Sequence, residues 1–219
     1  MRGVTAGLMV IAFGLASAGP AAAQSVTKYD EHWYRGNFWS GEYPGGFTLS
    51  RSLDVMLRPS LDPASEKSIA CKLPMGATYH VWNTPRVQSD GLAFVSYTEI
   101  TEMKVIKPVS ATIYPEYGNG DESAEVEVDF KPGMKWQYLA YLGEGAYLLS
   151  YDGATYQGYD DLYGASEALG ENEGARYDEW LRINCDNNMW GWLYLPDVKG
   201  LPGVEEPNIG GYGGAEDLK

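Results

Sequence analysis

The chain has few cysteines and histidines, two of each in 219 residues, and few basic side chains relative to acidic ones. His32 and His80 have no second ligand at the close spacing of a zinc site, which argues against zinc. With 16 Lys and Arg against 30 Asp and Glu, the formal net charge is −14. Such a surface repels nucleic-acid phosphates and anionic lipid headgroups. We therefore do not expect nucleic acid as a partner.

Long apolar runs are also missing, because no stretch approaches the roughly 20 residues of a transmembrane helix. The apolar run from Val4 to Leu15 follows Arg2 and precedes the small residues that end at Ala23. A positive start, a short apolar core and an A-x-A site are the parts of a secretory signal peptide. We expect cleavage after Ala23, a periplasmic or secreted mature chain, and no membrane insertion of that chain.

Established catalytic motifs are absent as well, since the sequence has neither G-x-S-x-G nor H-E-x-x-H. Ser25 and Lys28 fit S-x-x-K, but they lie at the expected mature N-terminus, where chains are usually mobile. Paired carboxylates for glycan hydrolysis remain an alternative, with Glu144 as the general acid and Asp152 or Asp160 as its partner. The favoured prediction is a protein without catalytic activity and without a cofactor.

The two cysteines, Cys71 and Cys185, both lie in the expected mature chain. An even pair in an oxidising compartment is most simply a disulfide. It would close a loop of more than a hundred residues, which the chain-entropy model values at about 4 kcal/mol. The alternative is two buried free thiols.

Short segments rich in β-formers, separated by Pro and Gly, favour an all-β fold built from small barrels. Part of the pattern recurs at an offset of 56 or 57 residues. Val55–Pro59 is followed by a Pro-x-Gly turn that ends at Gly76, and Ala111–Pro115 by a Pro-Gly turn that ends at Gly133. Asp90-Gly-Leu-Ala-Phe-Val also parallels Asn188-Met-Trp-Gly-Trp-Leu. We interpret these parallels as a degenerate repeat with an insertion in its second copy.

The apolar strand before Arg58-Pro59, the Pro-Gly turns and the run Asn188–Leu195 resemble the bacterial SH3 domains, small five-stranded barrels of the cell envelope. The resemblance implies two SH3-like barrels in tandem, the second closed by the hairpin Trp180–Leu195. Membership implies binding of peptidoglycan peptides or of proteins more often than catalysis. The expected organisation is a signal peptide (1–23), an aromatic N-terminal wrap (24–50), a first module (51–108), a second module (109–199) with an insertion (142–176), and a disordered tail (200–219).

Aromatic side chains near carboxylates suit sugar rings or amine-bearing stem peptides of the cell wall. The residues expected to form this ligand-binding surface are Trp136, Tyr138, Tyr151, Tyr156, Tyr159, Trp190, Trp192 and Tyr194. The partner is thus predicted to be a cell-wall peptide or glycan, and an envelope protein bound in a scaffolding role is the alternative. On an alternating strand Trp190, Trp192 and Tyr194 should share one face, which is either barrel core or binding surface.

The acidic insertion leaves one further alternative open. Its carboxylates could bind Ca²⁺, although the D-x-D-x-D-G loop of an EF-hand is missing. A solvated acidic loop is the preferred interpretation. The acids considered are Asp152, Asp160, Asp161, Glu171 and Glu173.

Overall fold

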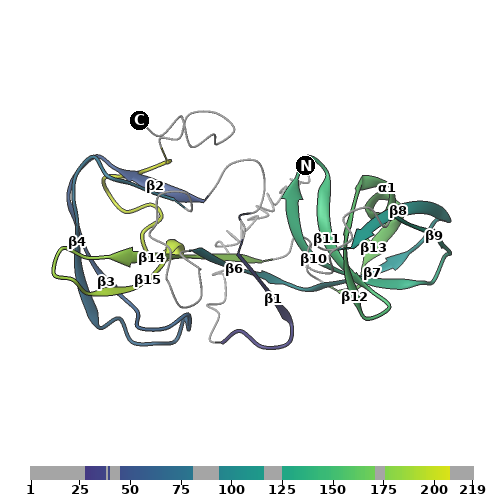
Figure 1. The fold of residues 1–219 in the computed structure, drawn as a ribbon, viewed down its shortest axis with the longest axis horizontal. Helices are drawn as coiled ribbons and strands as arrows, with labels where there is room; N and C mark the ends of the chain where they lie inside the picture. Colours follow the sequence, from purple (N-terminus) through teal and green to yellow (C-terminus); the bar gives the residue numbers. More distant parts are fainter. Residues whose placement is uncertain are drawn as a thin grey trace, which may run out of the picture.

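The fold is seen in a computed structural model of the chain, which describes residues 28–37, 39, 45–80, 94–115, 125–170 and 176–207 (Figure 1). These residues form two lobes of antiparallel strands. Helical structure in them is limited to the short helix α1 (Asp160–Gly164) and the 3₁₀ turn η1 (Leu195–Asp197). The prediction of an all-β fold is confirmed.

The outer lobe contains residues from both ends of the described chain, 28–99 and 176–207. Its first sheet has the order β1-β6-β14-β15, its second the order β16-β2-β5, and β3 pairs with β4. A bridge between Arg58 and Trp192 joins the β3 segment to β15. The strands are β1 (Trp33–Gly36), β2 (Gly46–Leu49), β3 (Leu53–Leu57), β4 (Ile69–Leu73), β5 (Thr78–His80), β6 (Phe94–Glu99), β14 (Tyr177–Asn184), β15 (Trp190–Tyr194) and β16 (Val204–Glu205).

The inserted lobe is the continuous segment 101–170. One curled sheet runs through it in the order β13-β7-β10-β11-β12-β8-β9 and encloses a core that includes Met103, Phe130 and Leu149. Its strands are β7 (Thr101–Val105), β8 (Val109–Pro115), β9 (Val126–Phe130), β10 (Lys135–Gly143), β11 (Ala146–Tyr151), β12 (Ala154–Gly158) and β13 (Ser166–Ala168).

The two lobes share local geometry where the sequence repeats. Gly76 N–H donates to the Leu49 carbonyl at 2.7 Å, and Gly133 N–H donates to the Val105 carbonyl at 2.8 Å. Both glycines have positive φ, 82° and 94°, a conformation that side chains with a Cβ rarely adopt. Each turn follows the second strand of a hairpin, β4 in the outer lobe and β9 in the inserted lobe. It leads into the next strand, β5 or β10. The repeat therefore has the same strand–turn–strand arrangement in both lobes.

The expected boundary between the modules is wrong, because the hairpin Trp180–Leu195 belongs to the outer lobe. β14 pairs antiparallel with β6, which places Trp180 opposite Val95, and Leu193 shares a core with Leu57. The hairpin thus closes the first copy of the repeat, not the second. In the second copy the corresponding hairpin is β11–β12, whose turn is formed by Asp152 and Gly153.

The segment 142–176 is correspondingly not a loop inserted in the second module. It supplies β11, β12, α1 and β13 of the inserted lobe, and the true insertion in the outer lobe is 101–170, between β6 and β14. β13 pairs with β7, so the first and last strands of the inserted lobe are neighbours. A domain whose two chain ends lie close together can be inserted between two strands of another domain without distorting the fold of either.

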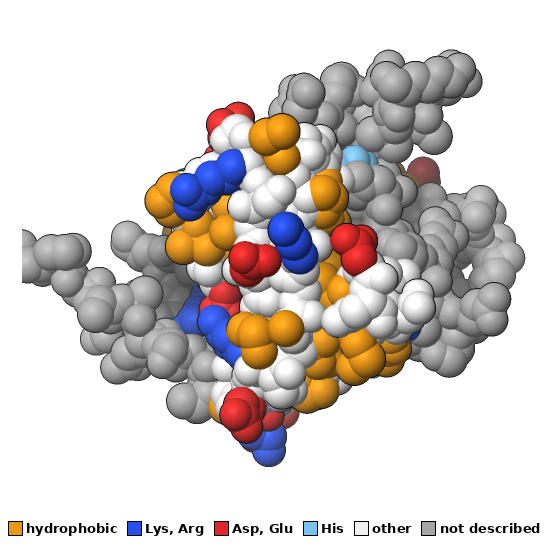
Figure 2. All heavy atoms as spheres, turned by 90° about the vertical axis from the view of Figure 1, so that its left-hand side faces the viewer, with side chains coloured by type: hydrophobic (Ala, Val, Ile, Leu, Met, Phe, Trp, Pro, Cys, Tyr) orange, Lys and Arg blue, Asp and Glu red, His pale blue; other side chains and the backbone are white. Residues whose placement is uncertain are grey.

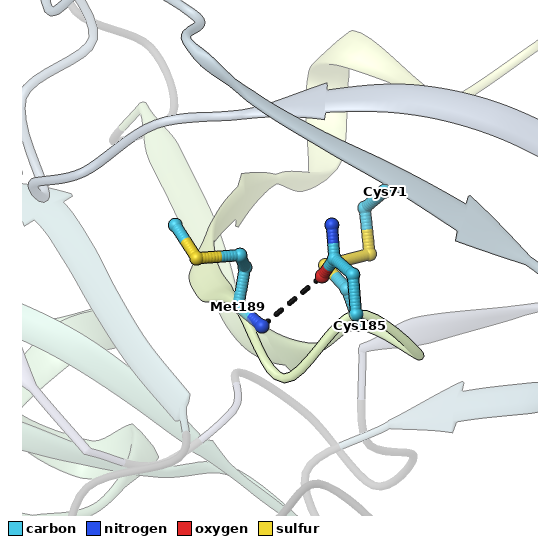
Figure 3. The surroundings of a disulfide bond; sticks show 4 residues. Cys71, Cys185 and Met189 are labelled. Atoms are coloured by element: carbon cyan, nitrogen blue, oxygen red, sulfur yellow. Dashed lines mark hydrogen bonds between the residues drawn. A yellow bond between two sulfur atoms is a disulfide. The ribbon is translucent and has the colours of Figure 1, made fainter.

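The disulfide Cys71–Cys185 is present and its prediction is confirmed, so the alternative of two free thiols is wrong. Figure 3 shows Cys71 on β4 facing Cys185 at the start of the turn after β14, with Met189 on the far side of that turn. Cys185 N–H donates to the Met189 carbonyl at 2.8 Å and closes the turn. Both half-cystines are buried in the outer-lobe core, so the bond joins two parts of one lobe.

The terminal segments are more ordered than expected. In the N-terminal wrap, β1 pairs with β6 and β2 lies between β5 and β16. The expected tail begins with folded residues, because Val204 in β16 pairs with Leu49. Residues 1–27, which include the expected signal peptide (1–23), and residues 208–219 lie outside the described residues. Asp90–Ala93, which belong to the sequence repeat, also lie outside them.

Candidate functional site

Three of the aromatic residues expected to bind a ligand in the inserted lobe instead pack around its core. Trp136 is 2 % exposed, and its Nε1–H donates to Ser166 Oγ at 3.0 Å. Tyr151 is half-buried, with its ring edge-on to Phe130 at 5.0 Å, and Tyr156 packs against the same core. A strand pattern specifies that side chains alternate, not which side meets the core.

The hairpin β14–β15 splits its tryptophans between solvent and core. Trp190 is 45 % exposed and its ring stacks under the Arg182 guanidinium at 3.9 Å, whereas Trp192 is 6 % exposed and packs with Val95 and Trp180. Figure 2 shows that end of the outer lobe, where apolar side chains are interspersed with single acidic and basic ones.

A group of tyrosines, partly buried and partly exposed, lies on β10, β11 and α1. The rings of Tyr138, Tyr147 and Tyr163 form a triangle with centroid distances of 5.6, 5.9 and 5.9 Å. Tyr141 lies three residues beyond Tyr138 on β10, and its hydroxyl accepts from Gly145 N–H at 3.3 Å. We call these four residues the tyrosine cluster. Tyr163 is 50 % exposed and Tyr141 is 37 % exposed, so aromatic surface is open to a ligand.

Carboxylates border the tyrosine cluster. A Cβ built on Gly145 would lie 2.6 Å from Asp160 Oδ2, so the Asp160 carboxylate rests against the β10–β11 turn. Burial raises the pKa of Tyr147, and the charges of Asp160 and Asp161 raise it further. Burial likewise raises the pKa of Tyr138 to about 12, with contributions from neighbouring tyrosines. The hydroxyl groups of Tyr138 and Tyr147 therefore keep their protons beside negative charge.

The inserted lobe is acidic as a whole. Residues 101–170 contain 12 Asp and Glu against 4 Lys and no Arg, a net charge of −8 over 70 residues. This is more than half of the formal −14 of the chain in under a third of its length. A field of this sign concentrates cationic ligands near the lobe.

Of the predicted binding residues, the structure brings Tyr138 to the tyrosine cluster and places Tyr159 beside it. Tyr159 is 44 % exposed, and its carbonyl accepts from the Tyr147 hydroxyl at 3.0 Å. Tyr141 and Tyr163 were not predicted. The sequence offered little signal for Tyr163, because α1 has only five residues and Tyr159 before it has an extended backbone.

The carboxylates considered for hydrolysis divide between two ends of one strand. Glu144 is in the turn before β11 and Asp152 is in the turn after it. At about 3.3 Å per residue the six residues of β11 separate them by roughly 20 Å, beyond the range for a glycosidase pair. Glu144 and Asp160 are both exposed and both border the Gly145 turn.

The Ca²⁺ alternative finds little support in these positions. Asp152 lies at the opposite end of β11 from Asp160 and Asp161, and Glu171 and Glu173 lie outside the described residues. Within the described ranges, the side chains close enough to share a metal ion are the exposed trio Asp30, Glu31 and His32.

A concave site lies in the outer lobe between β2, β14 and the segment after η1. It is a cleft of 680 Å³ lined by Phe47, Glu179, Lys199 and Glu205, among others. Burial raises the pKa of the Glu179 carboxyl to about 7, against the lowering effects of a hydrogen bond from Tyr177 Oη at 3.3 Å and of the Lys199 charge.

The chain has no significant match to a protein-family model, to a curated protein or to a solved structure. Among the described residues, no helix is long and apolar enough to cross a membrane. The disulfide is compatible with an extracellular or periplasmic location.

Proposed function

We propose that the protein is a non-catalytic binding protein of the bacterial cell envelope, which holds amine-bearing cell-wall peptides at the tyrosine cluster. The observation that carries this proposal is the exposed pair Tyr141 and Tyr163 beside the carboxylates of Asp160 and Asp161. The compartment follows from the expected signal peptide and is supported by the disulfide.

Amines are the chemistry that this surface fits best. An ammonium group over a tyrosine face gains about 0.5–1 kcal/mol at an exposed site, and a nearby carboxylate adds direct attraction. The net charge of −8 on the inserted lobe increases the local concentration of such cations. Sugar rings can stack on the same tyrosine faces, so the glycan strand is a second contact of one cell-wall ligand.

The strand order supports the resemblance to bacterial SH3 domains, which remains part of this proposal. In the inserted lobe, five neighbouring strands follow the order β13-β7-β10-β11-β12, so the last strand returns beside the first. The outer lobe has the related order β16-β2-β5 in one sheet and β6-β14-β15 in another. Small barrels of this family bind peptidoglycan peptides or proteins more often than they catalyse a reaction.

A pull-down with purified sacculi tests the proposal. Wild-type protein should be retained well above an unrelated protein of similar acidity, and the double variant Tyr141→Ala/Tyr163→Ala should be retained about fivefold to tenfold less. The matched control is Trp190→Ala, which removes an equally exposed aromatic ring from the outer lobe. Acetylation of the free amines in the sacculi should mimic the double variant.

Each outcome has a definite meaning. Absence of retention refutes a cell-wall ligand and leaves the scaffolding alternative, which predicts a protein partner in crosslinking. Retention that Trp190→Ala abolishes and the tyrosine variant does not would place the ligand on the outer lobe. Turnover of a glycan that is lost in Glu144→Gln would replace binding by hydrolysis.

A further inference from the structure

A tyrosine from the N-terminal segment fills a polar recess on the outer lobe. Tyr29 stacks on Tyr97 with ring centroids 3.6 Å apart and meets the Trp180 ring edge-on at 6.5 Å. Its hydroxyl accepts from Trp180 Nε1–H at 2.8 Å and donates to Asp178 Oδ2 at 3.1 Å. The hydroxyl of a phenol in this recess therefore both accepts and donates a hydrogen bond.

The floor of the recess is built by residues outside the N-terminal segment. Asp178 is 3 % exposed and also accepts from the Tyr194 hydroxyl at 2.8 Å. The Arg58 guanidinium lies 5.6 Å from the ring centroids of Trp180 and Tyr194, and it pairs with Asp197. Strands β14 and β15 and the end of β3 thus hold these groups in place through contacts that do not involve Tyr29.

The recess is separate from the core that holds the outer lobe together. Val95, Trp180 and Trp192 form a buried cluster on one face of the β6-β14-β15 sheet, whereas Phe94 and Leu181 pack on the other face around the disulfide. Tyr29 packs against the first cluster, that of Val95, Trp180 and Trp192. The main core of the lobe therefore does not depend on a tyrosine at this place.

The inserted lobe has a site that corresponds to the Tyr29 recess. Among the described residues, no tyrosine from another segment covers it as Tyr29 covers the recess. Tyr114 pairs with β12 as Arg58 does with β15, and Tyr159 precedes α1 as Tyr194 precedes η1. Tyr114 and Tyr159 meet edge-on at 5.9 Å, and Tyr159 remains 44 % exposed. The shared arrangement folds without an added phenol.

The segment that delivers Tyr29 is seated like a bound peptide. β1 adds antiparallel to β6 at the edge of the sheet, with Trp33 opposite Glu99. Trp33 meets the Tyr29 ring edge-on at 5.1 Å and lies under the Arg176 guanidinium at 5.9 Å. Extended peptides bind sheet edges in this way, with backbone hydrogen bonds giving affinity and side-chain pockets giving specificity.

We propose that the face formed by β6, β14 and β15 is a binding site for tyrosine-bearing extended peptides of a partner protein, and that the segment Tyr29–Gly36 occupies it in cis. The partner presents a tyrosine four residues before a second aromatic residue, as Tyr29 and Trp33 do. It competes with the cis segment, so access requires displacement of β1. This site is distinct from the tyrosine cluster, and its test does not depend on cell-wall binding.

The test uses the full mature chain carrying Tyr29→Ala, which empties the recess. The probes are p-cresol, which is the tyrosine side chain alone, and a synthetic peptide of residues 28–37. Calorimetric titration should show saturable binding of both probes to Tyr29→Ala and at least tenfold weaker binding to the wild type. A peptide with alanine in place of its first tyrosine should bind about tenfold more weakly, because its two hydroxyl hydrogen bonds are lost.

Two control variants keep the result interpretable. Tyr29→Phe retains the ring in the recess and should block p-cresol as the wild type does. Trp190→Ala in the Tyr29→Ala background should leave binding unchanged, because Trp190 is exposed at the other end of the hairpin. If Tyr29→Ala is unfolded alone, p-cresol should restore its folded circular-dichroism spectrum.

The contrary outcomes are equally clear. Equal binding of p-cresol to wild type and Tyr29→Ala, or no binding and no restoration of folding, overturns the proposal. Exchange of β1 between two copies, seen as a stable dimer of Tyr29→Ala with wild type, would replace the partner protein by self-association.

Discussion

The Glu179 carboxyl should make the stability of the protein fall as the pH rises from about 4.5 to 7. Burial raises the pKa of this group from 4.5 to about 7 in the folded protein. Gly45 contributes to that burial, since a Cβ at this position would lie 1.9 Å from Glu179 Oε1. The folded state therefore binds the proton more tightly than the unfolded state, and stability present below pH 4.5 is lost through this window.

The magnitude follows from the two pKa values. The difference between 4.5 and about 7, at about 1.36 kcal/mol per pKa unit, corresponds to about 3 kcal/mol. Because the side chain retains some solvent exposure, screening reduces the expected effect to about 2 kcal/mol. Glu179→Gln removes the charge that must be desolvated while keeping an acceptor for the Tyr177 hydroxyl.

Urea unfolding of wild type and Glu179→Gln at several pH values measures this effect. The variant should be more stable than the wild type by about 2 kcal/mol at pH 8, and this advantage should disappear by pH 4.5. Glu205→Gln is the matched control, because Glu205 borders the same cleft but is exposed. A difference between wild type and Glu179→Gln that stays constant within about 0.5 kcal/mol from pH 4.5 to 8 would refute the reasoning.

Three further perturbations test the packing. Replacing Cys71 and Cys185 together by alanine should lower the free energy of unfolding by about 2–5 kcal/mol, and dithiothreitol should reproduce this in wild type during denaturant unfolding. Gly191→Ala should cost about 1–3 kcal/mol in the same assay, because its Cβ would lie 2.8 Å from Leu57 Cβ; an unchanged midpoint would show that the hairpin shifts freely. Leu149→Ala should cost about 2–5 kcal/mol in the inserted lobe, and hydrogen exchange should show lost protection there while the outer-lobe strands retain theirs.

Local features of the fold were predictable from the sequence, whereas the assembly of its strands was not. The polar run Asp186-Asn187-Asn188 inside Trp180–Leu195 favours a turn, which indicates a hairpin there, and the two cysteines predicted the disulfide. The partner of the hairpin was assigned wrongly because a strand pattern carries no record of the strand it pairs with. Chain order suggested the preceding module, yet β14 pairs with β6, across 77 residues of intervening chain (99 to 177).

The candidate site was predictable only in part, for a related physical reason. Alternation placed the aromatic residues on strands but did not show which face of each strand meets the core. Trp136 is buried, whereas Tyr141, five residues later and therefore on the opposite face of β10, is 37 % exposed. Tyr163 was missed because the short helix α1 contributes a single turn, too little for a periodic signal.

The nesting of one lobe inside the other also favours an order of folding as the chain is synthesised. The inserted lobe is local in sequence, so its sheet can close once Ala168 in β13 has emerged. The outer lobe must wait for Glu205, which pairs with Thr48 across 156 intervening residues (49 to 204). A folded inserted lobe then brings β6 and β14 together and shortens the remaining search. Formation of the Cys71–Cys185 bond would report the moment at which the outer lobe closes around it.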